Sequence, residues 1–223
     1  MESKHEGNRR IFAVGDIHGC LQQLESLMDR LPIHPEEDLL VFVGDYINRG
    51  PQSREVIDFL LELRTRVADT VFLMGNHEFA LLQYASTCDL EYLKILRVMG
   101  VEATLKSYGD SPVSSLCGLS FLPDEHRIFL KGLLPYYETS GYLFTHAGIL
   151  PEEDYRTAPL DRLLFVRDVF LNDDQAIEPV VVFGHTPFET PFVAPGKIGI
   201  DTGAVYGNML TAVELPRLRF YHA

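Results

Sequence analysis

The chain has 223 residues, of which 46% are hydrophobic, enough for one sizeable core and a single domain over residues 1–223. Its formal net charge of -13 disfavours binding to nucleic acids or to anionic membranes. The polar N-terminus lacks the apolar core of a signal peptide, and no stretch approaches the roughly 20 apolar residues of a membrane span. We therefore expect a cytoplasmic monomer without nucleic-acid or membrane partners.

The three cysteines, Cys20, Cys88 and Cys117, show no spacing that is typical of a metal site. Their odd number favours reduced thiols in a cytosolic protein. We expect all three side chains to be small buried hydrophobic groups.

The first half of the chain alternates between two kinds of apolar pattern. Apolar runs at 11–14, 39–43 and 71–74 predict buried strands. Between these strands, apolar residues recur at helical spacing over 21–31 and 53–63. Successive strand, helix and strand units of this length predict parallel strands with right-handed crossovers.

A helical segment follows at about 79–121, and we expect it to form a small cap over one edge of the site. A further helix is predicted at 124–131, bracketed by Pro123 and Gly132. The rest of the chain favours short strands, which are predicted at 136–138, 142–145, 180–183, 193–194, 198–200, 209–214 and 217–221. This half is richer in hairpins, so we predict a mixed α/β fold with a two-sheet core flanked by helices.

Five of the predicted strands end in loops that present Asp, Asn or His. The loops are Gly15–Gly19, Gly44–Gly50, Gly75–Glu78, Thr145–Gly148 and Gly184–Thr186. Taken singly, each of these residues has an ordinary explanation as a turn former, a helix cap or a hydrogen-bonded core histidine. Open α/β sheets place their chemistry at the carboxyl ends of strands, and the recurrence on five strands favours one shared site.

The loops together supply a mixed set of oxygen and nitrogen ligands: Asp16, His18, Asp45, Asn76, His146 and His185. Such a set suits Mn, Fe or Zn and does not resemble a calcium or thiolate zinc site. Six ligands exceed what one catalytic metal usually takes. Two divalent metal ions that share a bridging carboxylate fit the number of ligands, and such pairs lie about 3.5–4 Å apart.

These ordered loops resemble the phosphoprotein phosphatase family of metal-dependent serine/threonine phosphatases, in its compact bacterial form, within the calcineurin-like metallophosphoesterase superfamily. The segment 199–207 is similar to the closing segment of the bacterial members. The resemblance implies a two-sheet β-sandwich and two metal ions, with manganese expected first and iron or zinc as alternatives. It also implies that Asp16, His18 and Asp45 hold one metal. Asp45 would bridge to the second metal, held with Asn76, His146 and His185.

Three further residues are expected to act on the substrate. Arg49 adjoins the bridging ligand, and its guanidinium can clamp two phosphate oxygens. By resemblance, Arg167 is the second phosphate-binding arginine, although it also fits a surface position on an amphipathic helix. His77 follows Asn76 directly, so its imidazole can reach the leaving-group oxygen as a general acid.

The sequence departs from the family pattern at Asn48. The resemblance implies an aspartate at this position, which hydrogen-bonds His77 and favours its protonated form. An amide can still orient the ring through its carbonyl oxygen, but it supplies no negative charge, so we expect His77 to hold its proton less well. Metal and phosphate binding should survive, whereas protonation of a poor leaving group should suffer.

We therefore predict a phosphatase that acts on phosphoserine or phosphothreonine in proteins or peptides, with phosphotyrosine as an alternative. A symmetrical hydrolase of dinucleoside tetraphosphates is a second interpretation, because those enzymes share the loops and also lack the aspartate. A third is a phosphate-binding module with little turnover, for which Asn48 is the support.

Overall fold

The computed structural model describes residues 9–151, 153–175 and 177–223. Its first half contains β1 (Ile11–Val14), α1 (Leu21–Arg30), β2 (Leu39–Phe42), α2 (Ser53–Arg66), β3 (Asp69–Phe72), α3 (Asn76–Thr87), α4 (Leu90–Val98) and α5 (Val101–Ser107). The middle contains η1 (Val113–Leu119), α6 (Asp124–Lys131), β4 (Tyr136–Glu138), β5 (Tyr142–Thr145), α7 (Leu160–Phe165) and α8 (Asp168–Leu171). The remainder contains β6 (Val180–Phe183), β7 (Phe192–Ala194), β8 (Lys197–Gly199), η2 (Ala204–Tyr206), β9 (Thr211–Leu215) and β10 (Arg219–His222).

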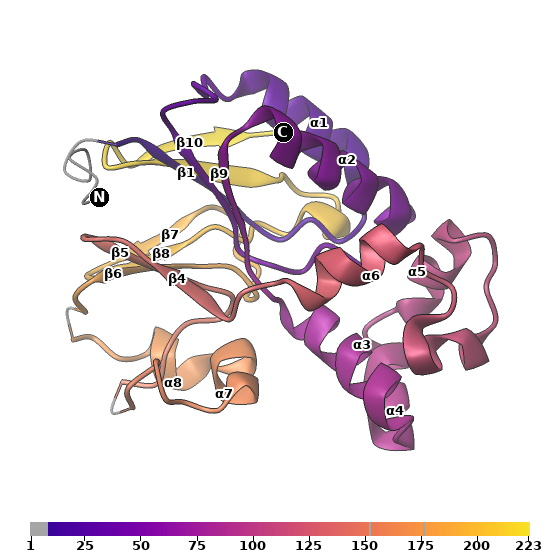
Figure 1. The fold of residues 1–223 in the computed structure, drawn as a ribbon. Helices are drawn as coiled ribbons and strands as arrows, with labels where there is room; N and C mark the ends of the chain where they lie inside the picture. The colour runs from indigo at the N-terminus through magenta and orange to yellow at the C-terminus, as the bar shows by residue number, and fades with distance from the viewer. Residues whose placement is uncertain (1–8, 152, 176) are drawn as a thin grey trace, which may run out of the picture.

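Within the described residues the strands form two mixed sheets that lie face to face (Figure 1). Their strand orders are β10-β9-β1-β2-β3 and β4-β5-β6-β8-β7. Strands β1, β2 and β3 are parallel, as predicted. The antiparallel pairs β4/β5, β7/β8 and β9/β10 are the hairpins expected in the second half. The predicted mixed α/β fold with a two-sheet core is confirmed.

The side chains of β1 alternate between the two faces of its sheet, and this alternation shows why the two sheets stack. Phe12 and Val14 pack in the cluster that includes the buried faces of α1 and α2. Ile11 and Ala13 point the other way, into the apolar layer between the two sheets. On the outer face of the second sheet, Phe183 packs against Phe170 of α8, and helices therefore cover both outer faces.

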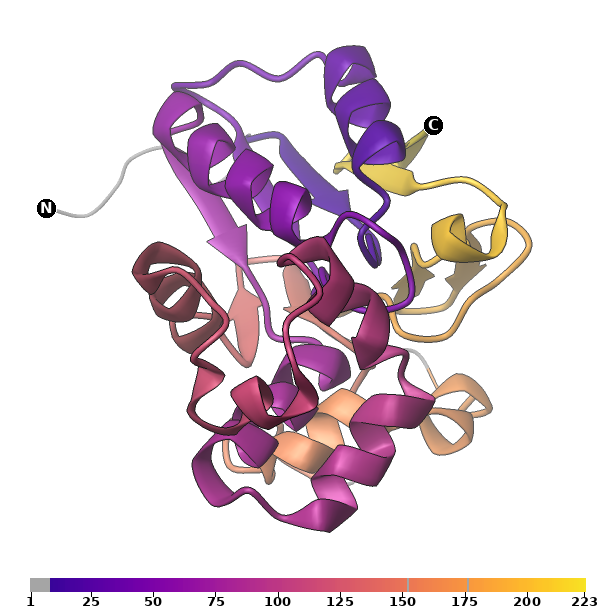
Figure 2. The ribbon, with the colours of Figure 1, turned by 90° about the vertical axis from the view of Figure 1, so that its right-hand side faces the viewer.

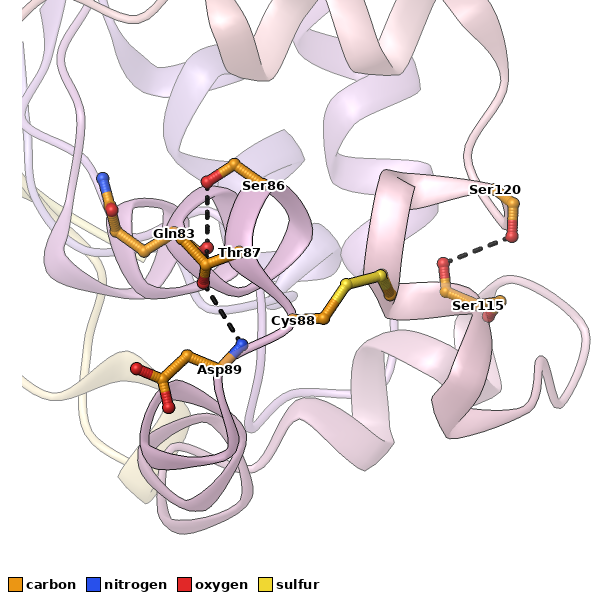
Figure 3. Close-up of a disulfide and its surroundings, with 8 residues drawn as sticks. Gln83, Ser86, Thr87, Cys88, Asp89, Ser115 and Ser120 are labelled. Carbon is orange, nitrogen blue, oxygen red and sulfur yellow. Dashed lines mark hydrogen bonds between the residues drawn. A yellow bond between two sulfur atoms is a disulfide. The ribbon is translucent and has the colours of Figure 1, made fainter.

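Helices α3 to α6 gather at one end of the two sheets (Figures 1 and 2). A disulfide in this region joins Cys88, directly after α3, to Cys117 in η1, with their Cα atoms 5.5 Å apart (Figure 3). The prediction of three reduced and buried thiols is therefore wrong for this pair, since Cys88 is exposed and Cys117 is only partly buried. The folding of α4 and α5 between the two cysteines brings them together across 29 residues, and no spacing rule indicates that approach. Cys20 is a buried free thiol, as predicted.

Strand β3 begins and ends two residues earlier than predicted. After Phe72, Leu73 still donates its backbone N–H to Phe42 of β2 and also forms a parallel bridge with Leu134. This bridge connects the first sheet to the segment after α6. Within the described part of the chain, no helix has the length and apolar character needed to cross a membrane.

Candidate metal centre

The five predicted loops meet at one end of the sandwich. Three of them follow the parallel strands β1, β2 and β3, and two follow β5 and β6, which are parallel to each other in the second sheet. Because parallel strands end at the same edge, their loops converge. The facing sheets then bring the two groups of loops together. Their predicted ligands are all buried: Asp16, His18, Asp45, Asn76, His146 and His185.

Two groups of side chains could each hold a metal ion, and they share Asp45. One group contains His18, Asp45 and His77, and the other contains Asp45, His146 and His185. The Nε2 atom of His18 lies 3.3 Å from Oδ2 of Asp45, and that of His146 lies 3.6 Å from Oδ1. Asp45 is thus placed between the two groups, where a bridging ligand would be needed.

The hydrogen bonds of His146 show that its metal-facing atom is an acceptor. Its Nδ1 lies 2.9 Å from the carbonyl oxygen of Val43, so this nitrogen carries the proton. In the neutral ring Nε2 then carries a lone pair, and it faces Oδ1 of Asn76 at 2.9 Å. Two acceptor atoms that face each other at this distance are stabilised by a cation between them.

His18 has the same arrangement, because its Nδ1 donates to the carbonyl oxygen of Ile47 at 2.9 Å and leaves the Nε2 lone pair directed at Asp45. Burial lowers the pKa of His18 to about 3, that of His146 to about 4 and that of His185 to about 2. All three rings are therefore neutral, as metal ligands must be. The same burial raises the pKa of Asp45 to about 7, and a bound cation would favour its ionised form. This donor set fits divalent metal ions.

Asp16 lies beside these groups but outside both. Its carboxylate oxygens accept the backbone N–H of His185 at 3.2 and 3.0 Å. Only glycine fits at 184, since a Cβ there would collide with Oδ1 of Asp16. Burial, together with the charge of Asp201, raises the pKa of Asp16. Asp201 is a buried acidic neighbour of the site that the sequence did not single out.

The backbone at the site is strained. His18, Asp45, Asn48, Arg49 and His185 have φ values of 46°, 55°, 69°, 65° and 64°. Residues other than glycine adopt this left-handed backbone conformation only at a cost in free energy. They keep it where the surrounding structure holds the backbone in place. The strain therefore coincides with the predicted site residues.

Glu78 holds the central loop in this conformation. Its fully buried carboxylate accepts the backbone N–H groups of Asp45, Tyr46, Ile47 and Gly75 at distances of 2.9–3.2 Å. Glu78 ends one of the five predicted loops, but no role was predicted for it. Its position three residues after Gly75, at the third position of α3, is the capping-box signal that could have identified it.

The two predicted phosphate-binding arginines contact different ligand groups. Nη1 of Arg49 lies 2.8 Å from Nε2 of His18, and Nε of Arg167 donates to Nε2 of His185 at 2.9 Å. Arg167 lies between α7 and α8, not within a helix as the sequence pattern suggested. Both guanidinium groups therefore reach the candidate metal centre.

Asn48 lies against His77, as expected, but through its nitrogen. Its Nδ2 is 3.0 Å from Nδ1 of His77, while its Oδ1 accepts the hydroxyl of Thr104 at 2.7 Å. The amide therefore donates to Nδ1, and the proton of the neutral ring resides on Nε2. This Nε2 has no hydrogen-bond partner among the described residues and lies 3.8 Å from Oδ2 of Asp45. Burial and the nearby His18 lower the pKa of His77, so the ring is neutral. Thr104, from α5, is a second contributor that the sequence did not identify.

Known proteins are similar to this chain over most of its length. The model of the calcineurin-like phosphoesterase family matches residues 9–208. The asymmetrical bis(5'-nucleosyl)-tetraphosphatases PrpE of Bacillus thuringiensis (strain Al Hakam) and Bacillus anthracis (strain CDC 684 / NRRL 3495) are each 28% identical, over 92% of this chain and 90% of theirs. A solved structure of a proposed diadenosine tetraphosphatase is 25% identical, with a TM-score of 0.69 over 97% of this chain and 94% of that one. The cold-active protein-tyrosine phosphatase of a psychrophilic Shewanella species is similar in fold, with 19% identity and a TM-score of 0.65 over 97% of this chain and 78% of that one.

Proposed function

Because the chain belongs to the calcineurin-like phosphoesterase family, we propose that it is a metal-dependent hydrolase that cleaves dinucleoside tetraphosphates asymmetrically. The products would be a nucleoside triphosphate and a nucleoside monophosphate. The observation that carries this choice is the amide of Asn48, which donates to Nδ1 of His77 where a protein phosphatase would be expected to have a carboxylate. The asymmetrical PrpE relatives from Bacillus species support the same substrate class.

The chemical reason lies in the leaving group. In a phosphoanhydride the departing oxygen belongs to a phosphate, whose second pKa is about 6, so it leaves as a stable anion. A serine or threonine oxygen would leave as a far more basic alkoxide and depends on a general acid. His77 is neutral and offers only its Nε2–H, which is a weak acid. The site is therefore better suited to phosphoanhydrides than to alkyl phosphate esters.

The other predicted residues have consistent roles in this reaction. Asp16, His18, Asp45, Asn76, His146 and His185 would hold two divalent cations, with manganese expected first. Such ions, when bound, polarise phosphate oxygens and lower the pKa of water. Arg49 and Arg167 would bind the phosphate oxygens. These cations would offset the net charge of -13, which otherwise repels a polyphosphate.

The second candidate is hydrolysis of phosphoserine, phosphothreonine or phosphotyrosine in proteins. It is favoured by the position of His77, whose Nε2–H points into the site 3.8 Å from Asp45. Phosphotyrosine would be the better of these substrates, because a phenolate is less basic than an alkoxide. A binding module with little turnover is the remaining alternative.

A direct comparison of substrates tests the proposal. The protein is stripped of metal with a chelator, supplied with Mn²⁺, and given diadenosine tetraphosphate, a phosphoserine peptide or a phosphotyrosine peptide. We expect ATP and AMP from the dinucleotide at a higher kcat/KM than phosphate release from either peptide. Two molecules of ADP would indicate symmetrical cleavage, and faster peptide dephosphorylation would favour the protein phosphatase. Turnover of none of them with any divalent metal would leave only the binding module.

We also propose that the protein is a cytoplasmic monomer whose partner is its phosphorylated substrate, without nucleic-acid or membrane partners. Size-exclusion chromatography and fractionation of cells test these properties. The disulfide between Cys88 and Cys117 is unusual for a reducing compartment, so its redox state in the cell is part of the same test.

A further inference from the structure

A groove of about 630 Å³ opens beside the candidate metal centre. One side is formed by residues of α3 and α4, and the other by α7, α8 and the segment that joins them. Its apolar lining consists of Phe79, Tyr92, Ile95, Leu150, Phe165, Val166 and Val169. Three of these side chains are well exposed, with relative exposures of 41% for Phe165, 39% for Ile95 and 63% for Val169. Apolar surface gathered in one hollow next to a polar site is typical of a ligand-binding groove.

Aromatic rings connect this groove to the metal centre. The ring of Phe165 lies 6.4 Å, centroid to centroid, from the ring of His185. Phe79, on the opposite side, lies 6.2 Å from Phe165 and 6.5 Å from Tyr92 of its own side, and both pairs meet edge to face. The groove therefore begins in contact with a candidate metal ligand, and its first surface is an exposed aromatic ring.

Basic and acidic side chains both line the groove. Arg167 lines its inner end and donates to His185, so the positive charge lies where phosphate would be bound. Beyond Arg167 the walls are aromatic and aliphatic. Asp161 and Asp168 are the acidic lining residues, which can accept N–H groups from a ligand, and Arg162, which pairs with Glu153, is the second basic one. A ligand that complements these groups carries a phosphate for Arg167 and a flat apolar ring with amino groups for the aromatic walls and the aspartates.

We propose that this groove binds one nucleoside of the substrate, with its base against Phe165 and its α-phosphate at the metal centre. This inference rests on the proposed function and deepens it. Base stacking on aromatic side chains is favourable and tolerant of sequence. Because Phe165 lies beside His185, a nucleoside bound against Phe165 would place its α-phosphate, the phosphate nearest the ribose, next to the metal ligands. The groove thus determines which phosphorus atom reacts.

The position of attack follows. The oxygen of water bonds to the α-phosphorus of the nucleoside held in the groove, and the bond from that phosphorus to the α,β-bridging oxygen breaks. The bridging oxygen leaves with the nucleoside triphosphate, which takes the electron pair, and the two protons of the water pass to solvent. Arg49, at the ligand group that contains His18, is the cation available to the departing triphosphate. The nucleoside bound in the groove is therefore released as the nucleoside monophosphate.

Isotope labelling tests the orientation directly. Diadenosine tetraphosphate is hydrolysed in water enriched in ¹⁸O, and the products are analysed by mass spectrometry. The proposal predicts that the label enters AMP. Label in the terminal phosphate of ATP, or cleavage to two ADP, would overturn the proposed placement while leaving the tetraphosphatase function intact.

Variants test the groove itself. Phe165→Ala and Ile95→Asp should lower the ratio of kcat/KM for diadenosine tetraphosphate to kcat/KM for p-nitrophenyl phosphate, by about tenfold for Phe165→Ala. Ile95 lies on α4 on the opposite wall from Phe165, so its variant separates base binding from disturbance of His185. Ile128→Ala removes an exposed side chain of α6 outside the groove and should leave the ratio unchanged.

An unchanged ratio in both groove variants would overturn the groove proposal alone. A wild-type protein that hydrolyses p-nitrophenyl phosphate but not the dinucleotide would overturn the proposed function and the groove proposal with it.

Discussion

The amide nitrogen of Asn48 lies 3.0 Å from Nδ1 of His77 and determines which ring nitrogen of this histidine carries the proton. The orientation of the amide is set by Thr104, whose hydroxyl donates to Oδ1 of Asn48 at 2.7 Å. The proton of His77 is consequently on Nε2, beside Asp45. Three residues from α3, α5 and the loop after β2 thus define the acid strength of the site.

Thr104→Val should weaken this arrangement. The variant leaves Oδ1 of the fully buried Asn48 without its hydroxyl donor and also removes an acceptor for the backbone N–H of Asn48. We expect a loss of about 1–3 kcal/mol in the free energy of unfolding. We also expect a fall of about tenfold in kcat for the phosphotyrosine peptide, because His77 loses its fixed orientation, and a smaller fall for diadenosine tetraphosphate, whose leaving group does not depend on a general acid. Thr104→Ser keeps the hydroxyl, and a Ser variant as impaired as the Val variant would contradict this explanation.

Glu78→Gln should destabilise the loop that carries Asp45. A glutamine has one acceptor oxygen and adds N–H donors, so it cannot accept the backbone N–H groups that both carboxylate oxygens now accept. We expect the free energy of unfolding to fall by about 2–4 kcal/mol in urea titrations. Metal affinity should fall with it. Glu91→Gln, on the exposed face of α4, is the matched control and should change stability little.

His146 should make the metal-free protein sensitive to acid. Burial lowers the pKa of His146 from 6.5 to about 4 in the folded state, so the unfolded chain takes up this proton first as the pH falls. The contribution of His146 to stability is complete at pH values above its pKa in the unfolded chain. It is lost as the pH falls toward its pKa in the folded protein. Relative to His146→Gln, the wild type should lose about 2 kcal/mol between about pH 7.5 and about pH 5 in the presence of chelator. If the free energy of unfolding fell in parallel for the two proteins, the lowered pKa of His146 would be refuted.

The disulfide should stabilise the helices at the end of the sheets. Joining Cys88 to Cys117 closes a loop across 29 residues and restricts the unfolded chain. The double variant Cys88→Ser/Cys117→Ser should lower the free energy of unfolding by about 2–4 kcal/mol under oxidising conditions. With reductant the wild type should approach the double variant. A stability that does not respond to reductant would show that the disulfide contributes little.

Local patterns predicted the strands well where an apolar run is bounded by turn residues. Strands β1, β4, β5 and β6 have the predicted bounds, because each run is short and ends at a polar or glycine-containing loop. Strand order was beyond sequence reasoning: β1 lies between β2 and β9, and its contact with β9 joins segments about 200 residues apart. Such pairing depends on how the complete sheet buries its faces.

The candidate metal centre was likewise predictable from the sequence only in part. The sequence placed Asn48 beside His77, and the structure brings them together through the convergence of β2 and β3. Thr104 could not be identified, since it is 56 residues from Asn48 and reaches it only when α5 packs against α2. The aromatic groove also went undetected, because Phe79 and Phe165 meet only after α3 and α7 pack together.

Asn48→Asp tests directly whether the amide at this position determines which substrate the protein prefers. A carboxylate at this position would stabilise the protonated form of His77 and so supply the acid that alkyl esters require. We predict that the wild type prefers diadenosine tetraphosphate to a phosphoserine peptide. We also predict that the variant raises the peptide-to-dinucleotide ratio of kcat/KM by about 100-fold. An unchanged ratio, or a wild type that already prefers the peptide, would contradict the account.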